Sequence, residues 1–256
     1  MAKLMYNSQN DILVSHKELN QLKTPAPLGA RHQPFAFGAF VDIIKESLDQ
    51  QGIELLAEEY AIGNEAQRLF GIMEIGMKGK HGDGFNRILG LRGSHDQSIP
   101  RGICLGSQVI VCSNLCFGGN LLTVRTKQTT NIAERLPLLI RDAVHTIPEL
   151  VEEQDNRYEA FKDKTITATA GDAHLVSIYR KGGLGVSNLT KAIQEWHEPT
   201  HEEHAEQGFS AWRLFNACTE ALKPSGNRGN MQTVETFSNR IDNYIASEVV
   251  NYKAAA

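Results

Sequence analysis

The sequence is poor in cysteine, proline and aromatic residues. Its 256 residues include only 4 Cys and 8 Pro, and aromatic side chains make up 7% of the chain. So few cysteines exclude the dense disulfide framework of small secreted domains, and the first residues lack the charged and apolar segments of a secretory signal. We therefore expect reduced cysteines and a cytoplasmic protein. Because 41% of the residues are apolar, the chain can build a packed core and is not generally disordered.

Long hydrophobic runs are also missing. Between Arg101 and Arg125 lie 23 residues without charge, and about 20 residues suffice to cross a bilayer. Polar and glycine residues such as Ser107, Gln108 and Gly118 interrupt this stretch, and they disfavour its insertion as a lone helix. We interpret it as buried strands separated by turns, and we expect no membrane partner.

Apolar residues in the first third of the chain change from helical spacing to strand-like runs. Phe40, Ile44 and Leu48 recur at helical spacing before Gly52, which predicts a helix that ends near this glycine. Runs rich in aliphatic and β-branched residues then predict three strands, the first two joined through a hairpin-type linkage at Gly63-Asn64. These strands are expected at residues 53–60, 67–75 and 85–91.

Helical patterns dominate the C-terminal half of the chain. After Asn131 an apolar face continues at helical spacing to Val151, and four further helices are expected. Their predicted ranges are 165–180, 187–197, 209–223 and 231–250. The sequence therefore predicts an α+β fold, in which an antiparallel-rich sheet from the N-terminal half packs against helices that come mostly from the C-terminal half.

The expected domain organisation is an arm followed by one domain. Pro25, Pro27 and Pro34 disfavour regular structure near the N-terminus, so residues 1–34 are predicted to form an irregular arm. Residues 35–256 are then expected to form a single α+β domain, which is sheet-rich over 53–126 and helical over 131–250.

Charge is unevenly distributed along the chain, although the net charge is only -4. Residues 76–145 hold nine Lys and Arg against four Asp and Glu, a balance of +5, whereas both flanking segments are acidic. Arginine suits bidentate contact with phosphate, so the central segment predicts a DNA-binding face; the alternative is ordinary solvated surface charge. Arg180 and Lys181 precede a glycine-rich stretch, and this pair is a further candidate for contact with an anion. The candidate DNA-binding residues are Arg87, Arg92, Arg101, Arg125, Lys127, Arg180 and Lys181.

Histidines and glutamates are densest between residues 197 and 204. His201 and His204 are three residues apart and would share one face of a helix, and His197 lies nearby, so the three are weak candidates for metal ligands. The segment lacks the HExxH spacing of zinc proteases, and the chain has no phosphate-loop, dinucleotide or nucleophile-elbow motif. We therefore expect no cofactor, assign no catalytic residue, and favour a protein that is not an enzyme.

The segment from residue 94 to residue 98 contains Ser, His and Asp side by side. Sequence neighbours do not converge as a hydrolase triad, because successive side chains point in different directions. Ser94, Asp96 and Ser98 are residue types that form turns and caps, and His95 is expected to hold the same turn by hydrogen bonds. A local structural role is the favoured interpretation.

Three segments together resemble a known family. Residues 91–98, 109–114 and 211–220 are similar to a phage- and plasmid-borne family catalogued as domain of unknown function 932, and the likeness extends over about residues 85–240. The resemblance implies a mobile-element protein made in the cytoplasm of a host bacterium, and it assigns no activity. The family motif falls on Ser94, His95, Asp96, Ser98, Cys112, Ser113 and Asn114, none with a known role.

Three classes of function follow from these observations. The first is a DNA-associated protein that binds single-stranded DNA through its basic central segment in replication or recombination. The second is a non-enzymatic protein that binds a host factor, for example to counter a bacterial defence, and the third is a metal-dependent hydrolase or nuclease. Central arginines on a single face would favour DNA, and scattered arginines would favour a protein partner. Assembly as a homo-oligomer stays open.

Overall fold

The computed structural model describes residues 11–77, 85–109, 115–116, 123–222 and 231–253. The chain divides into two compact units, and the sequence did not predict the boundary between them. The first unit comprises Met1–Gly106 with Leu122–Pro148, and the second comprises Ser107–Leu121 with Glu149–Ala256. The α+β fold class is confirmed, since strands gather in the N-terminal half and helices lie mostly in the C-terminal half.

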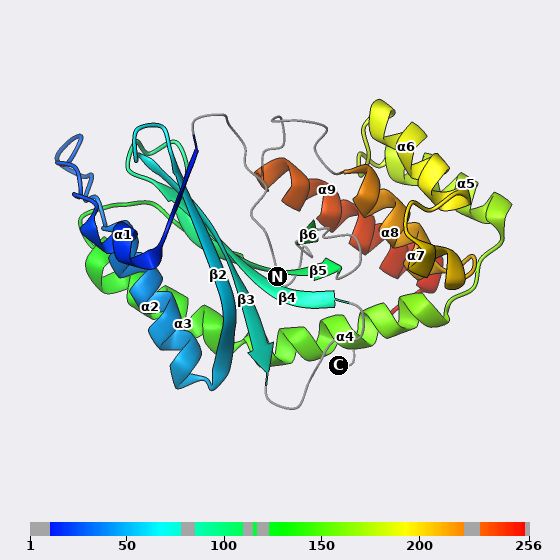
Figure 1. Cartoon of the computed structure of the whole chain (residues 1–256), viewed down its shortest axis with the longest axis horizontal. Coiled ribbons are helices and arrows are strands. Elements are labelled where there is room, and N and C mark those ends of the chain that lie inside the picture. The colour runs from blue at the N-terminus through cyan, green and yellow to red at the C-terminus, as the bar shows by residue number, and fades with distance from the viewer. Residues whose placement is uncertain (1–10, 78–84, 110–114, 117–122, 223–230, 254–256) are drawn as a thin grey trace. The chain divides into compact units, whose positions relative to one another are not determined.

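A twisted sheet forms the centre of the first unit (Figure 1). Its neighbouring strands follow the chain from β1 to β5, with β7 also paired to β5, and the pairs β1–β2, β2–β3, β3–β4 and β5–β7 are antiparallel. The strands are β1 (Ile12–Val14), β2 (Ile53–Gly63), β3 (Arg68–Met77), β4 (Phe85–Ser94), β5 (Arg101–Val109) and β7 (Thr123–Thr126). All three predicted strands and the turn after Gly63 are confirmed.

Two helices pack in the first unit beside the sheet. The first is α2 (Phe37–Gln50), which presents its predicted apolar face, including the fully buried Phe40 and Ile44, and contacts β2. It also lies along α3 (Ile132–His145), as Figure 1 shows. The apolar spacing predicted this helix because only one of its faces is buried.

The predicted irregular arm is wrong over residues 12–21. These residues form β1 and the short helix α1 (His16–Gln21). Ser15 caps this helix: its hydroxyl accepts from the amide of Glu18, whose carboxylate accepts from the amide of Ser15 at 2.6 Å. This capping box stabilises a helix that is too short to show apolar periodicity.

The described part of the second unit is mainly helical, with a short strand β6 (Leu115–Cys116) that pairs with the end of β5. Its central helix, α8, is buried along most of its length, and Trp212 and Phe215 stack there at 5.5 Å between ring centroids. The four predicted helices are confirmed. The helices are α4 (Ile147–Asp163), α5 (Ala168–Arg180), α6 (Val186–His197), α7 (Glu202–Glu206), α8 (Ala211–Ala221), α9 (Met231–Tyr244) and the π-helix η1 (Ile245–Val250).

The uncharged stretch from residue 102 to residue 124 contributes strands where it is described, as the sequence predicted. Within the described residues, no helix has the length and apolar character needed to span a membrane.

Candidate anion-binding site

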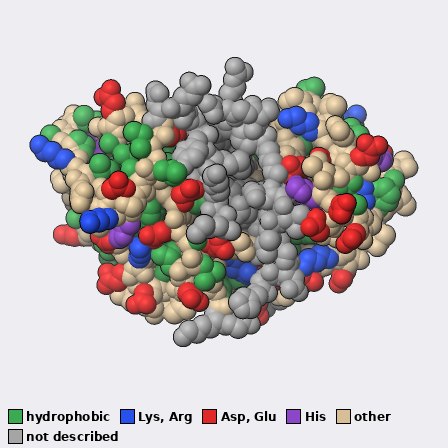
Figure 2. Space-filling model, viewed as in Figure 1, with side chains coloured by type: hydrophobic (Ala, Val, Ile, Leu, Met, Phe, Trp, Pro, Cys, Tyr) green, Lys and Arg blue, Asp and Glu red, His purple; other side chains and the backbone are tan. Residues whose placement is uncertain are grey.

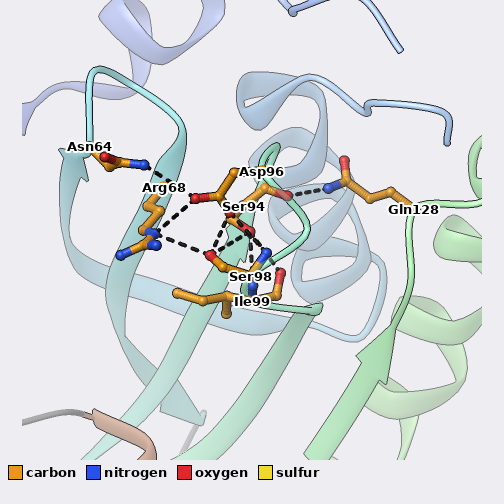
Figure 3. A network of polar contacts seen from close by, with 7 residues as sticks. All are labelled: Asn64, Arg68, Ser94, Asp96, Ser98, Ile99 and Gln128. Carbon is orange, nitrogen blue, oxygen red and sulfur yellow. Dashed lines mark hydrogen bonds and ion pairs between the residues drawn. The ribbon is translucent and has the colours of Figure 1, made fainter. Parts of the chain in front are cut away.

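The turn between β4 and β5 is organised around Asp96 (Figure 3). One carboxylate oxygen, Oδ1, accepts from the backbone amide of Ser98 at 2.9 Å and from its hydroxyl. The other, Oδ2, accepts from Arg68 Nε and from Asn64 Nδ2, both at 3.2 Å. Across the base of the turn, the Ser94 hydroxyl accepts from the amide of Ile99 at 2.9 Å. The predicted turn-forming role of the three residues Ser94, Asp96 and Ser98 is therefore confirmed.

Asp96 is ionised in this environment. Partial burial by itself raises the pKa of the carboxyl, but hydrogen bonds from Ser98 and Ser94 and the charge of Arg68 outweigh burial, so the pKa of Asp96 lies well below its usual range. The charged carboxylate locks the turn and holds Gln97 with a left-handed φ of 62°. Such a φ is uncommon outside glycine, which indicates a fixed loop conformation.

His95 contributes to the turn through its backbone rather than through its ring. Its backbone amide donates to the carbonyl of Gln67 at 2.8 Å, whereas ring atom Nδ1 is buried and has no partner among the described residues. The ring lies 4.1 Å from that of Phe37, centroid to centroid. Burial, with the charges of Arg101 and His32, lowers the pKa of His95 to about 4. The expectation that His95 holds the turn by hydrogen bonds is confirmed for its backbone amide, whereas its neutral ring packs against an aromatic neighbour.

Arg101, the first residue of β5, is completely buried. Its guanidinium donates from Nη2 to Gln128 Oε1 at 3.1 Å and from Nη1 to the carbonyl of Ala36 at 3.4 Å. It lies over the rings of Phe37 and Phe40, 4.9 and 5.2 Å from their centroids. The Nε atom has no hydrogen-bond partner, and no carboxylate of the described chain pairs with this arginine. A buried charge without an opposite charge is costly, so Arg101 is suited to receive an anion.

The guanidinium of Arg101 stays charged at neutral pH. Burial lowers the pKa of Arg101 to about 9, which is still above 7. Gly93 on β4 leaves room for the side chain, because an alanine Cβ at this position would lie 3.2 Å from Arg101 Cγ. The local sequence thus accommodates a buried cation.

Gln128 connects Arg101 to two other segments. Its Oε1 atom, which accepts from Arg101, also accepts from the amide of Phe35 at 2.9 Å. Its Nε2 atom donates to the carbonyl of Ser94 (Figure 3). One amide side chain therefore joins the residues before α2, the turn after β4 and the guanidinium.

A cavity of about 460 Å³ opens beside these residues, entirely within the first unit. Arg31 and Lys127 are exposed, whereas His32 and Arg101 are buried. None of the described lining residues is acidic. The lining comprises Leu28, Gly29, Ala30, Arg31, His32, Gln97, Ile99, Pro100, Arg101, Lys127, Gln128 and Thr129. A concave site with cationic groups and no carboxylate can hold an anionic group.

His32 adds a hydrogen-bond donor to this cavity. Ring atom Nδ1 accepts from the backbone amide of Leu28 at 3.0 Å. In the neutral ring, the proton therefore resides on Nε2, which is buried and has no partner among the described residues. Two residues of the lining thus carry buried donors without acceptors among the described residues, His32 at Nε2 and Arg101 at Nε, and the latter atom lies beside Gly93.

The five central cations predicted to bind DNA do not share one exposed face. Arg87 and Arg92 are buried, with exposed fractions of 4% and 8%, and Arg101 is fully buried. Because side chains alternate along a strand, Arg87 and Arg92 on β4 point to opposite faces of the sheet. Only Arg125 and Lys127 are exposed, and Figure 2 shows acidic and basic side chains interspersed over the visible described surface.

The predicted anion contacts at the end of α5 are separate from this cavity. Arg180 and Lys181 belong to the second unit and are exposed. Lys181 already pairs with Glu248 at 2.8 Å and lies 5.0 Å from the ring centroid of Tyr244.

Of the three candidate metal ligands, His201 and His204 lie side by side, with their ring centroids 5.5 Å apart, whereas His197 has other neighbours. His197 Nε2 contacts Asp172 at 2.8 Å, and His201 Nε2 lies 3.8 Å from Glu220. His204 is buried, and burial and the charge of His201 lower the pKa of His204. Among the residues that the structure describes, no group of three or more His, Cys, Asp or Glu is arranged to hold a metal ion.

Part of the family motif cannot be placed. Cys112, Ser113 and Asn114 lie outside the described residues. Conversely, Arg31, His32 and Gln128 line the cavity, although the sequence did not single them out. The adjacent basic residues Arg31 and His32 could have been noted in the sequence. Their proximity to Lys127 and Gln128 arises only when the chain folds.

Comparison of the chain with models of protein families, with curated proteins and with solved structures gave no match.

Proposed function

We propose that the first unit binds single-stranded DNA by placing a phosphate group in the cavity lined by Arg31, His32, Arg101 and Lys127. The supporting observation is the lining itself, which combines four basic side chains with no acidic residue among those described. Phosphate oxygens accept hydrogen bonds from guanidinium, imidazole and ammonium groups, and such contacts provide most of the affinity for nucleic acid.

This proposal places the DNA contact in a cavity rather than on a broad basic face. The burial of Arg87 and Arg92 limits contact to a concave site, with Arg125 as an exposed cation on β7 outside the lining residues. The likeness to a phage- and plasmid-borne family favours a role in the replication or recombination of a mobile element in the bacterial cytoplasm.

The second candidate is a non-enzymatic protein that binds a host factor. The scattered positions of the central cations favour it, since three of the five are buried and therefore cannot form an electrostatic surface for a nucleic-acid backbone. The two candidates differ in whether the purified protein binds DNA.

Fluorescence anisotropy with a labelled single-stranded oligonucleotide at low and moderate salt tests the first candidate. We expect Arg31→Ala/Lys127→Ala to weaken binding and to reduce the slope of log affinity against log salt by about 1.4, since each lost phosphate contact removes about 0.7. The matched control is Lys17→Ala/Arg141→Ala, which removes one exposed Lys and one exposed Arg of the same unit away from the cavity.

Equal weakening by the two double variants would contradict a localised site, and a duplex oligonucleotide tests the preference for single strands. Absence of binding at low salt would remove the DNA candidate. The host-factor candidate would then be pursued by isolating partners from the host cell.

A further inference from the structure

We propose that the cavity is built for a phosphomonoester, the group found at a phosphorylated strand end or on a free nucleotide, rather than for an internal phosphodiester. Since it rests on the phosphate-binding function proposed above, the same residues carry it: Arg31, His32, Arg101 and Lys127. Three features of the cavity distinguish the two kinds of phosphate.

The first feature is the burial of Arg101. Arg101 is completely buried, and its guanidinium is already held by Gln128 and Ala36. A ligand group must therefore enter the cavity to approach it. A phosphomonoester is attached through one oxygen and can enter end-on, whereas a phosphodiester must bring the chain on both of its sides into the same space.

The second feature is the charge of the lining. Arg31, Arg101 and Lys127 are basic side chains of the lining, and no described lining residue is acidic. A phosphomonoester carries a charge of about -1.5 to -2 at pH 7, compared with a single negative charge on a diester. The excess of positive charge therefore favours the monoester.

The third feature is the pair of buried donors without acceptors. His32 Nε2 and Arg101 Nε have no partner among the described residues. A monoester offers three free oxygens, so that it can accept from a buried donor and still contact the exposed Arg31 and Lys127. The cavity volume of about 460 Å³ also lies within the range that holds a small ligand, roughly 300 to 1,000 Å³.

The test compares strands that differ only at their ends. A single-stranded oligonucleotide labelled at an internal base is prepared with a 5′-phosphate, with a 3′-phosphate or with two hydroxyl ends, and binding is followed by anisotropy. We expect one phosphorylated form to bind about tenfold more tightly than the hydroxyl form, the effect of a charge-assisted contact. In parallel, a nucleoside monophosphate and its nucleoside are titrated by calorimetry, and only the former is expected to bind.

Two variants locate the effect while preserving the fold. In His32→Asn, the side-chain oxygen replaces Nδ1 as the acceptor for the amide of Leu28, but the donor at Nε2 is lost. In Arg101→Lys, the charge is kept and the planar guanidinium is lost. Both are expected to reduce the preference for the phosphorylated end severalfold, with circular dichroism as the check on folding.

The possible outcomes distinguish a failure of the monoester site from a failure of DNA binding. Equal binding of phosphorylated and hydroxyl-ended strands, together with no binding of the nucleoside monophosphate, overturns the monoester site but leaves DNA binding standing. Binding of the nucleoside monophosphate without binding of any strand supports the monoester site and removes DNA as its ligand. If the variants His32→Asn and Arg101→Lys fold and keep the full preference for the phosphorylated end, the monoester does not bind in this cavity.

Discussion

Each unit buries an arginine among aromatic rings, and the two arginines differ in what their nitrogens contact. Arg213 on α8 donates from Nε to the carbonyl of Trp196 at 3.0 Å and from Nη2 to the carbonyl of His197 at 3.2 Å. Its guanidinium lies 4.6 Å from the ring centroid of Phe209. Arg101 has a similar aromatic surrounding, but its Nε has no partner in the described part of the chain, and the residue lines a cavity.

This difference separates a structural arginine from one suited to a ligand. In the second unit, the arginine satisfies two backbone carbonyls, which links α8 to the end of α6. In the first unit, the Nε donor of the guanidinium has no acceptor among the described residues. Burial of an arginine therefore does not indicate function by itself, whereas an unsatisfied donor beside a cavity does.

The largest loss of stability is expected from a substitution that fills the space beside the ring of Trp196 in the second unit. An alanine Cβ at Gly171 on α5 would lie 2.2 Å from the ring of Trp196, which is fully buried. We expect Gly171→Ala to lower the free energy of unfolding by about 3 kcal/mol, since overpacking forces neighbours to move.

The matched variant in the first unit is Gly93→Ala, whose Cβ would lie 3.2 Å from Arg101 Cγ. It is expected to cost about 1 kcal/mol, because the contacts with Arg101 Cγ, Nε and the backbone Cα, at 3.2 to 3.3 Å, require a smaller displacement than the one at Gly171. Urea unfolding followed by circular dichroism gives both values, and equal losses would contradict the difference between the two sites.

Removing the two arginines tests the comparison directly. Arg213→Met leaves one buried and one partly buried carbonyl without this donor, and we expect a loss of about 2 kcal/mol in the free energy of unfolding. Arg101→Met also removes the donor to Gln128 Oε1 and to the Ala36 carbonyl. Because it removes a buried charge without a carboxylate partner at the same time, its loss is expected to be smaller, about 1 kcal/mol. A larger loss for Arg101→Met than for Arg213→Met would make Arg101 the structural residue of the pair.

The neutral histidine beside Arg101 gives a pH-dependent prediction. The pKa of His95 is about 4 in the folded protein, compared with about 6.5 in an unfolded chain. As the pH falls from 6.5 to 4, the unfolded state binds the proton first, so the free energy of unfolding decreases in this window. His95→Gln should show a shallower decrease in urea unfolding measured across this range.

Arg101→Met should also make that decrease shallower, because the charge of Arg101 is one cause of the lowered pKa of His95. His174 and His204, whose pKa values burial also lowers, respond in the same direction, so the difference between variants is the informative quantity. Identical slopes in the wild type and in His95→Gln would show that His95 does not titrate as described.

The smallest effect is expected at the exposed pair of Lys181 and Glu248. Both side chains are more than half exposed, with 58% and 51% of their surface accessible. Exposed ion pairs contribute little, so Lys181→Ala should change the free energy of unfolding by less than about 0.5 kcal/mol. It should also leave oligonucleotide binding unchanged, in contrast to Lys127→Ala, and an equal loss in the two variants would extend the binding surface to the second unit.

Much of the fold could be predicted from local patterns. The spacing of Phe40, Ile44 and Leu48 predicted α2 because one face of this helix is buried, and the strand runs predicted β2 to β4 for the corresponding reason. The turn at residues 94–98 was also predictable, since Asp and Ser side chains bond to nearby backbone groups.

The cavity could not be predicted in this way. Its lining comes from three segments, near residues 28–32, 97–101 and 127–129. They are brought together by the pairing of β5 with β7, by the pairing of His32 with Thr129 and by the contacts of Gln128. The burial of Arg101 depends on the missing side chain of Gly93 and on rings contributed by α2. Arginine is usually exposed, so composition predicted a surface cation at this position.

The distribution of tryptophan makes the two units spectroscopically distinct. The chain has 2 Trp, and both of them, Trp196 and Trp212, are buried in the second unit. Excitation selective for indole therefore follows the second unit alone, whereas far-ultraviolet dichroism follows both. Denaturation curves that coincide by the two methods would mean that the units lose their structure together, and curves that separate would assign a stability to each unit without dividing the chain.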